Sequence, residues 1–320
     1  INELPHITVQ ERGKIMKYKK FFLVIVLIVC LLSIVNVSAS DANDTIMASD
    51  YNSIENEDVS SSEPSLLGAA SDGTFTDLAN EIAKSKGELN LTKNYKYTSS
   101  DSSYQKGIPI SKSIVINGNG FTLDGKGQAR IFKITNSNVI LNNICFVRAY
   151  SHEYAYAVGA AIYWSGDNGT LSNCSFKNST INYNGSVYWS GANGKMVNCN
   201  FVTSNAIGGY CGAVAWSGTN GTLSNCSFVN TYSFSDYGAV TWRGSYGTLS
   251  DCSFVDSTIF SGGSGGAVTW RGSYGSLSGC SFVNSTVYEG FGGAVAWYGN
   301  NGAVTDCSFI NSTVNIDGVG

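Results

Sequence analysis

The sequence predicts an all-β fold, a right-handed, single-stranded parallel β-helix (a solenoid) with a short N-terminal capping helix. Three observations predict it: a repeat of about 27 residues, a composition of strands and tight turns, and a bend residue at a fixed place in every repeat. Of the 320 residues, 37 are Gly, 3 are Pro and 13% are charged, which suits strands joined by turns better than a helical bundle.

Two columns of residues define the repeat. A Cys follows each Trp after ten residues, whereas 15 to 18 residues separate that Cys from the next Trp. One stretch therefore has a fixed geometry, and the variation in length falls in one loop, which we expect to leave the coil after the Phe that follows each Cys. The columns are Trp164, Trp189, Trp216, Trp242, Trp270 and Trp297, and Cys174, Cys199, Cys226, Cys252, Cys280 and Cys307.

The fixed stretch predicts two strands joined by a turn. Residues 213–216 (Ala-Val-Ala-Trp) and their equivalents form the first strand, in which Val and Trp share parity while the residue between them varies and is expected to face solvent. The turn reads Trp-x-Gly-x-x-Gly in all six copies, and glycine at fixed places indicates a positive φ or a close approach of backbone.

The residue before each Cys predicts a bend. It is always Asn, Asp or Gly, the residue types that best tolerate the left-handed conformation. The Phe two residues after each Cys is then expected to point inward and to form a column of its own. The bend residues are Asn173, Asn198, Asn225, Asp251, Gly279 and Asp306.

The N-terminal part predicts export. Residues 1–15 are interpreted as an upstream extension, and residues 16–40 as a signal peptide with basic residues after Met16, an apolar run and small residues at 37–39. A retained signal anchor is the alternative. Residues 41–72 contain eight acidic residues and no basic one, which predicts a disordered linker. The expected location is therefore outside the cell or at its surface.

The rest of the chain is divided between a cap and the coils. Residues 73–154 are expected to form the cap, with helical spacing over 75–83, and two degenerate first coils. Residues 155–320 hold the six repeats. No closing element precedes Gly320, so we expect a fragment whose missing C-terminal region carries more coils and an anchor.

Two motifs carry a resemblance to known families. Residues 114–125 resemble the first coils of pectate-lyase-like right-handed β-helix proteins, and residues 265–268 (Gly-Gly-Ala-Val) with 282–284 (Phe-Val-Asn) resemble polymorphic outer-membrane-protein repeats. The Phe-to-Asn spacing is shorter than in that second family, so its membrane anchoring is not carried over. Over roughly 73–320 the pattern is most similar to the adhesin-like surface proteins of methanogenic archaea.

The archaeal resemblance implies a secreted or wall-associated adhesin whose partner is a glycan or protein of a neighbouring cell. A membrane is expected as a partner only through the signal peptide or a missing C-terminal anchor. The net charge of −4 argues against nucleic acid. Asn-x-Ser/Thr sequons make the chain a glycoprotein candidate, although Asn173 and Asn225, at the bend, are expected to be sterically protected.

No cofactor, metal or catalytic site is predicted. The chain has two His residues and no paired CxxC motif, so we expect the Cys column to consist of free, buried thiols, with disulfides as the alternative. The Trp column allows two interpretations, an inward core column, which the parity favours, and an exposed stripe on which sugars stack.

A carbohydrate-active enzyme is the alternative, less favoured prediction of function. A carbohydrate-active β-helix lyase or hydrolase needs clustered charged residues, and 155–320 holds only seven acidic and four basic ones. Asp124 and Arg130 are the best catalytic candidates, and each has an equally good turn or surface explanation. Arg243 and Arg271, in successive turns, are interpreted as solvated charges.

Overall fold

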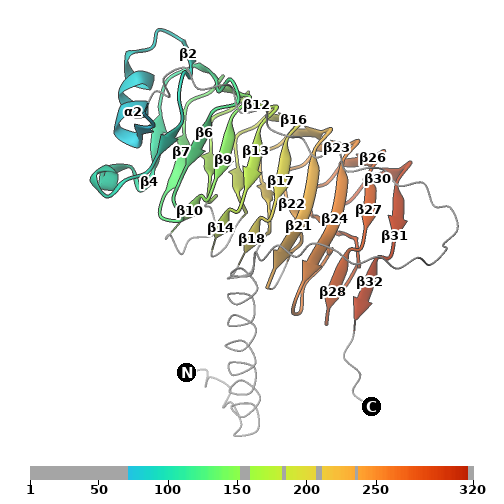
Figure 1. Ribbon diagram of the computed structural model, residues 1–320. Helices are drawn as coiled ribbons and strands as arrows, with labels where there is room; N and C mark the ends of the chain where they lie inside the picture. Colours follow the sequence, from blue (N-terminus) through green and yellow to red (C-terminus); the bar gives the residue numbers. More distant parts are fainter. Residues whose placement is uncertain (1–70, 152–158, 182–184, 207–210, 235–236, 316–320) are drawn as a thin grey trace, which may run out of the picture. The chain divides into compact units, whose positions relative to one another are not determined.

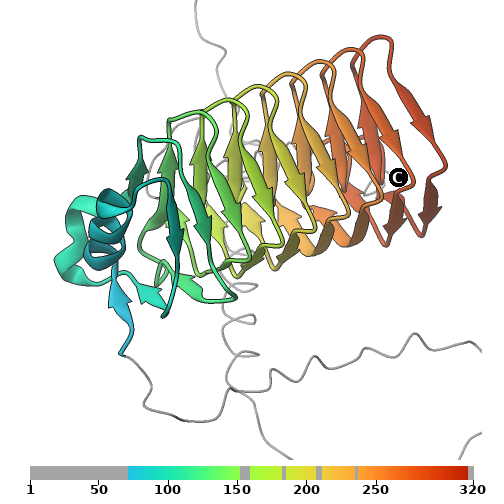
Figure 2. The same cartoon turned by 90° about the horizontal axis from the view of Figure 1, so that it is seen from above.

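The computed structural model describes residues 71–151, 159–181, 185–206, 211–234 and 237–315. They form a parallel β-solenoid of about eight coils in which successive coils stack side by side, with α2 at one end (Figures 1 and 2). The predicted extension 1–15, the signal peptide 16–40 and all of the linker before residue 71 lie outside the described residues.

Three sheets run along the rod, and we call them the Trp, Leu and Phe sheets after the residues that they bury. The Trp sheet has eight strands, the Leu sheet nine and the Phe sheet fifteen. Neighbouring strands pair in parallel and in register, so that Trp lies beside Trp, Leu beside Leu and Phe beside Phe.

Most strands have three residues, as the short β-rich runs of the sequence predict. The Trp sheet consists of β4 (Lys106–Ile110), β7 (Arg130–Ile134), β11 (Ile162–Trp164), β15 (Val187–Trp189), β19 (Val214–Trp216), β22 (Val240–Trp242), β25 (Val268–Trp270) and β29 (Val295–Trp297). The Leu sheet consists of β2 (Glu88–Asn90), β5 (Val115–Asn117), β8 (Ile140–Asn142), β12 (Thr170–Ser172), β16 (Lys195–Val197), β20 (Thr222–Ser224), β23 (Thr248–Ser250), β26 (Ser276–Ser278) and β30 (Ala303–Thr305).

The Phe sheet is wider because, from β9 onward, each coil crosses it with two short segments, which merge into one strand in β21 and β24. The first segments are β1 (Gly73–Thr74), β3 (Tyr95–Lys96), β6 (Thr122–Asp124), β9 (Cys145–Val147), β13 (Ser175–Lys177), β17 (Asn200–Val202), β21 (Ser227–Ser233), β24 (Ser253–Ile259), β27 (Ser281–Val283) and β31 (Ser308–Ile310). The separate second segments are β10 (Tyr150–Ser151), β14 (Thr180–Ile181), β18 (Asn205–Ala206), β28 (Thr286–Tyr288) and β32 (Thr313–Asn315).

Helix α2 (Phe75–Lys84) covers the N-terminal end of the core, as the spacing of its apolar residues predicts (Figure 2). Thr74 and Asp77 form a capping box at its start, which satisfies backbone N–H groups that the first turn leaves unpaired. Leu78 and Ile82 are buried against the first coils. The helix therefore closes one end of the hydrophobic column.

One buried carboxylate ties this cap together. Asp101, in the 3₁₀ helix η1 (Ser99–Tyr104), is 1% exposed and accepts hydrogen bonds from the backbone N–H and hydroxyl groups of both Thr76 and Thr98, at 2.6–2.9 Å. Burial by itself raises the pKa of Asp101, but these four bonds to the charged form outweigh it and lower the pKa below its usual value.

The predicted bend lies before each Cys. All six residues at that position have φ between 50° and 61°, the left-handed region that Asn, Asp and Gly tolerate. The side-chain amide of Asn198 donates to the Asn173 amide oxygen at 3.0 Å, so the bend is also a ladder between coils. The bend prediction is confirmed.

A second bend follows five residues later, and it corrects the predicted exit of the loop. Asn178, Asn230 and Asn284, for example, have φ between 52° and 54°. The chain then forms a further short strand, such as β28, before it leaves the sheet. The prediction that the loop leaves directly after Phe is wrong, because this left-handed residue turns the chain back into register with the neighbouring coil.

Candidate functional site

The Trp column packs the core. The indole rings of Trp164 to Trp270 are fully buried, that of Trp297 is partly buried, and neighbouring ring centroids lie 4.1–4.8 Å apart in parallel stacks. Phe rings stack in the same way in the Phe sheet, at 4.5–4.9 Å. Of the two interpretations of the Trp column, the structure has the inward one, because five of the six indole rings are fully buried between their neighbours and have no face free for a sugar.

The two glycines in the turn after each Trp are required because other atoms lie too close for a side chain, and not because their φ is positive. A Cβ on Gly272 would lie 1.9 Å from the carbonyl oxygen of Gly244 in the preceding coil, and one on Gly275 would lie 2.4 Å from the Trp270 ring. The positive φ of this turn falls instead on the residue before the second glycine, which is Asn in four of the six repeats.

The Cys column consists of free thiols. Cys174, Cys199, Cys226, Cys252 and Cys280 are buried, and Cys307 is half-buried. Neighbouring members are linked through backbone N–H···S contacts at 3.3–3.5 Å, not through S–S bonds. Off the column, Cys145 is half-buried and Cys211 is buried, and both are free.

Burial governs the reactivity of two of these thiols. It raises the pKa of Cys199, in the column, and of Cys211, outside it. Both groups therefore remain protonated thiols near neutral pH, and a protonated thiol is a poor nucleophile and a poor metal ligand. Within the part of the chain that the structure describes, no group of three or more His, Cys, Asp and Glu side chains is arranged to hold a metal ion.

The two catalytic candidates have separate structural roles. Asp124 pairs with Arg148 and with Lys126; burial raises the pKa of Asp124, but these bonds to the charged form lower it below the usual value. Arg130 is 2% exposed and donates to two backbone carbonyls and to the Ser151 hydroxyl. These contacts account for both charges without a substrate.

The sequons differ from expectation at the bend. Asn173 and Asn225 are exposed, not protected, because the left-handed turn directs each side chain out of the coil. The Asn173 amide nitrogen is nevertheless engaged, since it donates to the Asn142 oxygen at 2.9 Å. None of the helices among the described residues is long and apolar enough to cross a bilayer.

The outer surface of the Trp sheet changes along the rod. The residue between Val and Trp in each strand points away from the core, as its parity predicts. In β11 and β15 it is Tyr163 and Tyr188, which are half-buried and stack at 5.7 Å. In the later strands it is buried: Ala215, Thr241, Thr269 and Ala296 are at most 7% exposed. The expectation that this position faces solvent is wrong for the later coils.

The segments that precede the later strands cover this outer face. Tyr237, Ser264 and Phe291 from three successive segments form parallel bridges with one another, outside the three sheets. The Thr269 hydroxyl donates to the Ser264 carbonyl, and the Tyr298 hydroxyl bonds to the Ser264 hydroxyl at 2.8 Å. The variable loop thus adds a fourth, irregular layer over one side of the rod.

Arginine and aromatic side chains gather beside this layer. The Arg271 guanidinium lies between the rings of Tyr237 and Tyr298, 4.9 Å from each centroid, and that of Arg243 lies 5.5 Å from the Tyr237 centroid. At these distances the positive charge is attracted to the electron-rich face of the ring, which restrains the guanidinium. The sequence interpretation of both arginines as solvated charges is therefore incomplete.

Two exposed tyrosines lie on the same turns as the arginines. Tyr246 and Tyr274 are 58% and 53% exposed, and their rings stack at 5.0 Å. We call Arg243, Tyr246, Arg271, Tyr274 and Tyr298 the Arg–Tyr strip. Sequence reasoning missed it, although its signal is visible: Arg replaces Ser, and Tyr replaces Asn, at fixed positions of the repeat.

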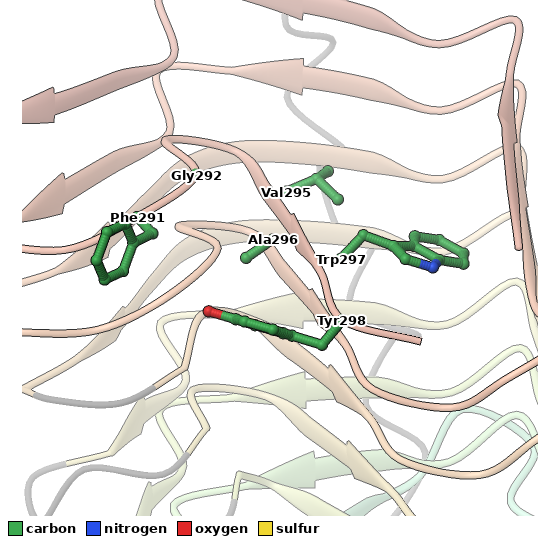
Figure 3. A pocket seen from close by; sticks show the side chains of 6 residues that line it. All are labelled: Phe291, Gly292, Val295, Ala296, Trp297 and Tyr298. Carbon is green, nitrogen blue, oxygen red and sulfur yellow. The ribbon is translucent and has the colours of Figure 1, made fainter. Parts of the chain in front are cut away.

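A shallow hollow adjoins the strip on the last coil. It has a volume of about 390 Å³, and its lining is mostly apolar. In Figure 3 the hydroxyl end of Tyr298 points to the side on which Phe291 lies, whereas the indole of Trp297 points the other way. The lining residues are Phe291, Gly292, Val295, Ala296, Trp297 and Tyr298.

Comparison with known proteins identifies no relative of this chain. No family model matches the sequence, and neither the curated proteins nor the solved structures give a match. The structure defines the class of the protein as a parallel β-solenoid. Helix α2 covers its N-terminal end, and an irregular layer and the Arg–Tyr strip lie on one side.

Proposed function

We propose that this protein is an adhesin-like surface protein, a rigid β-solenoid that is secreted or held at the cell surface and binds a glycan or protein of a neighbouring cell. The observation that carries the proposal is the contrast between a core repeated coil after coil and an outer surface that changes along the rod. A catalytic scaffold needs one convergent site, whereas an adhesive rod needs a stable support for varied side chains.

Two features of the sequence support this assignment. Residues 16–40 resemble a signal peptide and precede an acidic linker, and the repeats resemble those of the adhesin-like surface proteins of methanogenic archaea. The strip of arginine and tyrosine on the outer face supplies the residue types that are enriched where proteins bind other molecules.

Adhesion of the full chain tests the proposal. Beads coated with the protein are expected to bind cells of its source and to retain members of a glycan array, whereas beads coated with a heat-unfolded sample are not. Absence of binding to both cells and array would contradict the proposal. So would turnover of a polysaccharide that is abolished by Asp124→Asn in a still-folded protein, which would favour a carbohydrate-active enzyme.

A further inference from the structure

The fold does not require the two arginines of the Arg–Tyr strip. The residue directly after Trp is Ser in three of the six repeats, at Ser165, Ser190 and Ser217, and these turns have the same close glycine contacts as the others. Because β22 and β25 are in register, Arg243 and Arg271 lie one coil apart. Like charges on adjacent strands repel each other, so this pair opposes stability unless an anion neutralises it.

Both guanidinium groups have aromatic neighbours, but no counter-charge faces them among the residues that the structure describes. Two aromatic rings lie within cation–π distance of the Arg271 guanidinium, and contacts of this kind do not use up its N–H groups as hydrogen-bond donors. Among the described residues, no carboxylate lies within ion-pair distance of Arg243 or Arg271, and neither side chain has a hydrogen-bond acceptor. Within the described part of the chain, the N–H donors of both guanidinium groups therefore remain available at the surface.

Two tyrosines of the strip, Tyr246 and Tyr274, have a backbone conformation that is unfavourable for tyrosine. Tyr246 and Tyr274 have φ of 58° and 57°, in the left-handed region, where the other four repeats have Asn. A bulky residue is a rare occupant of this region and is retained there at a cost in stability. Both residues are exposed, and among the described residues their rings stack on each other alone, so core packing does not explain this backbone strain.

We propose that the Arg–Tyr strip binds a linear polysaccharide whose units carry carboxylates, with the sugar chain running along the rod. The edge of a guanidinium donates two parallel hydrogen bonds to a planar carboxylate, which is the group that this arrangement fits best. The exposed edges and hydroxyls of the stacked tyrosines contact the sugar rings. The inference rests on the adhesive function proposed above and names its ligand.

The repeat of the rod matches this ligand. Successive strands lie about 4.8 Å apart, and the Tyr246 and Tyr274 rings, one coil apart, lie 5.0 Å apart. This step is close to the length of one pyranose unit in a linear chain. One sugar unit can therefore meet each coil, and the two arginines can reach carboxylates on nearby units.

Direct binding to alginate oligosaccharides, which are polymers of uronates, tests the proposal on the full chain. Arg243→Ser with Arg271→Ser introduces the residue that three native coils already have, so the variant is expected to fold with a melting temperature that is not lowered. Its affinity for alginate is expected to fall at least about tenfold, because each charge-assisted hydrogen bond contributes at least that factor. Carboxyl-reduced alginate is expected not to bind either protein.

A charge-matched control separates a built site from general attraction. Lys177→Ser with Lys195→Thr removes two exposed positive charges from the Phe and Leu sheets, and it is expected to leave the affinity within about twofold. An equal loss in both variants would overturn the proposal. So would no binding of alginate by the unaltered protein, or binding of dextran sulfate that exceeds that of alginate.

The strained tyrosines give a second, independent measurement. Tyr246→Asn with Tyr274→Asn is expected to weaken alginate binding and at the same time to raise the melting temperature by about 2–4 °C, because Asn relieves the left-handed strain. A lower melting temperature, or unchanged binding, would contradict their assigned role. If alginate binding is absent while coated beads still adhere to cells, this inference fails alone; if alginate binds and beads do not adhere, the adhesive function fails alone.

Discussion

Early and late coils of the solenoid share one core but present different surfaces. In the early coils, begun by β11 and β15, the indole N–H of each Trp is buried without a hydrogen-bond partner among the described residues. In the late coils, begun by β22, β25 and β29, each indole N–H donates to the glycine carbonyl two residues on, at 2.9–3.0 Å. The stacked rings themselves are alike in both.

The outer face differs more than the core. Early coils expose part of Tyr163 and Tyr188 and have Ser after Trp, whereas in the late coils an irregular layer covers the sheet and Arg or Tyr follows Trp. An inward residue meets its own kind above and below, so any change disturbs two neighbours at once. An outward residue meets solvent or a loop, and it can change from coil to coil at little cost.

The largest expected loss of stability comes from replacing a turn glycine, and it is the same in the early and the late coils. Gly191→Ala in an early turn and Gly272→Ala in a late one each place a Cβ 1.9 Å from a backbone carbonyl oxygen of the preceding coil. Because that oxygen belongs to backbone, neither coil can yield, and we expect a loss of about 4 kcal/mol or more in the free energy of unfolding. Urea denaturation measures it, with Ser245→Ala as the neutral control. A loss no larger than that of the control would show that the turn is not the shared constraint.

The next effect separates the two regions. Trp242→Phe removes a hydrogen bond to the Gly244 carbonyl, whereas Trp189→Phe removes an indole N–H that has no partner. Both lose packing area, but the late variant should be less stable than the early one by about 1–3 kcal/mol. The comparison needs only the two denaturation midpoints. Equal midpoints would mean that the indole N–H contributes nothing to the difference between the coils.

An effect of similar size is expected at the bend residue Asn225, which lies in a coil between the early and the late ones. Asn225 has φ of 50°, where a β-branched residue is strained, while Ser224 lies on the half-buried outer side of its strand. Asn225→Val is expected to cost about 1–3 kcal/mol, and Ser224→Val within about 0.5 kcal/mol of zero. Thermal denaturation of the two variants gives the answer, and similar melting shifts would contradict the role of the left-handed conformation.

The smallest expected effect is a loss of local stability at low pH, which should be greater at the N-terminal end than in the late coils. The pKa values of Asp101 and Asp124 are lowered in the fold, so their contribution to stability is full above the unfolded pKa of about 3.9 and is lost as the pH falls through the lower folded values. Hydrogen exchange at pH 7 and pH 3, corrected for intrinsic rates, should show protection falling in residues 73–124 more than in 240–297. A uniform fall would contradict this assignment, and Asp101→Asn should reduce the difference.

Most of the fold could be predicted from the sequence because six copies of the repeat show which residue types recur at each position and which occur there by chance. The bend, the inward Val, Trp and Phe, and the capping helix each follow from residue types that recur at fixed places. The second bend has an equally visible signal in the sequence, because Asn or Asp recurs five residues after the first bend, at Asn178, Asn230, Asp256, Asn284 and Asn311.

The outer layer and the Arg–Tyr strip could not be predicted in the same way. They depend on contacts between segments of different length, such as that between Tyr237 and Arg271, which lie far apart in the sequence but one coil apart in space. No periodic pattern marks such a pair. In the sequence, Arg271 is one charge in a polar turn. Only the structure shows that two aromatic rings restrain its guanidinium.

The ladders of hydrogen bonds between coils also determine how the rod bears force. Bonds such as that from the Asn225 N–H to the Ser250 carbonyl run along the rod, so tension between its ends pulls directly on the bonds of one coil at a time. A coil that yields releases about 27 residues and lengthens the chain by about 90 Å. A tether of this kind would dissipate a pull in a series of equal steps, coil after coil, while its remaining coils stay folded.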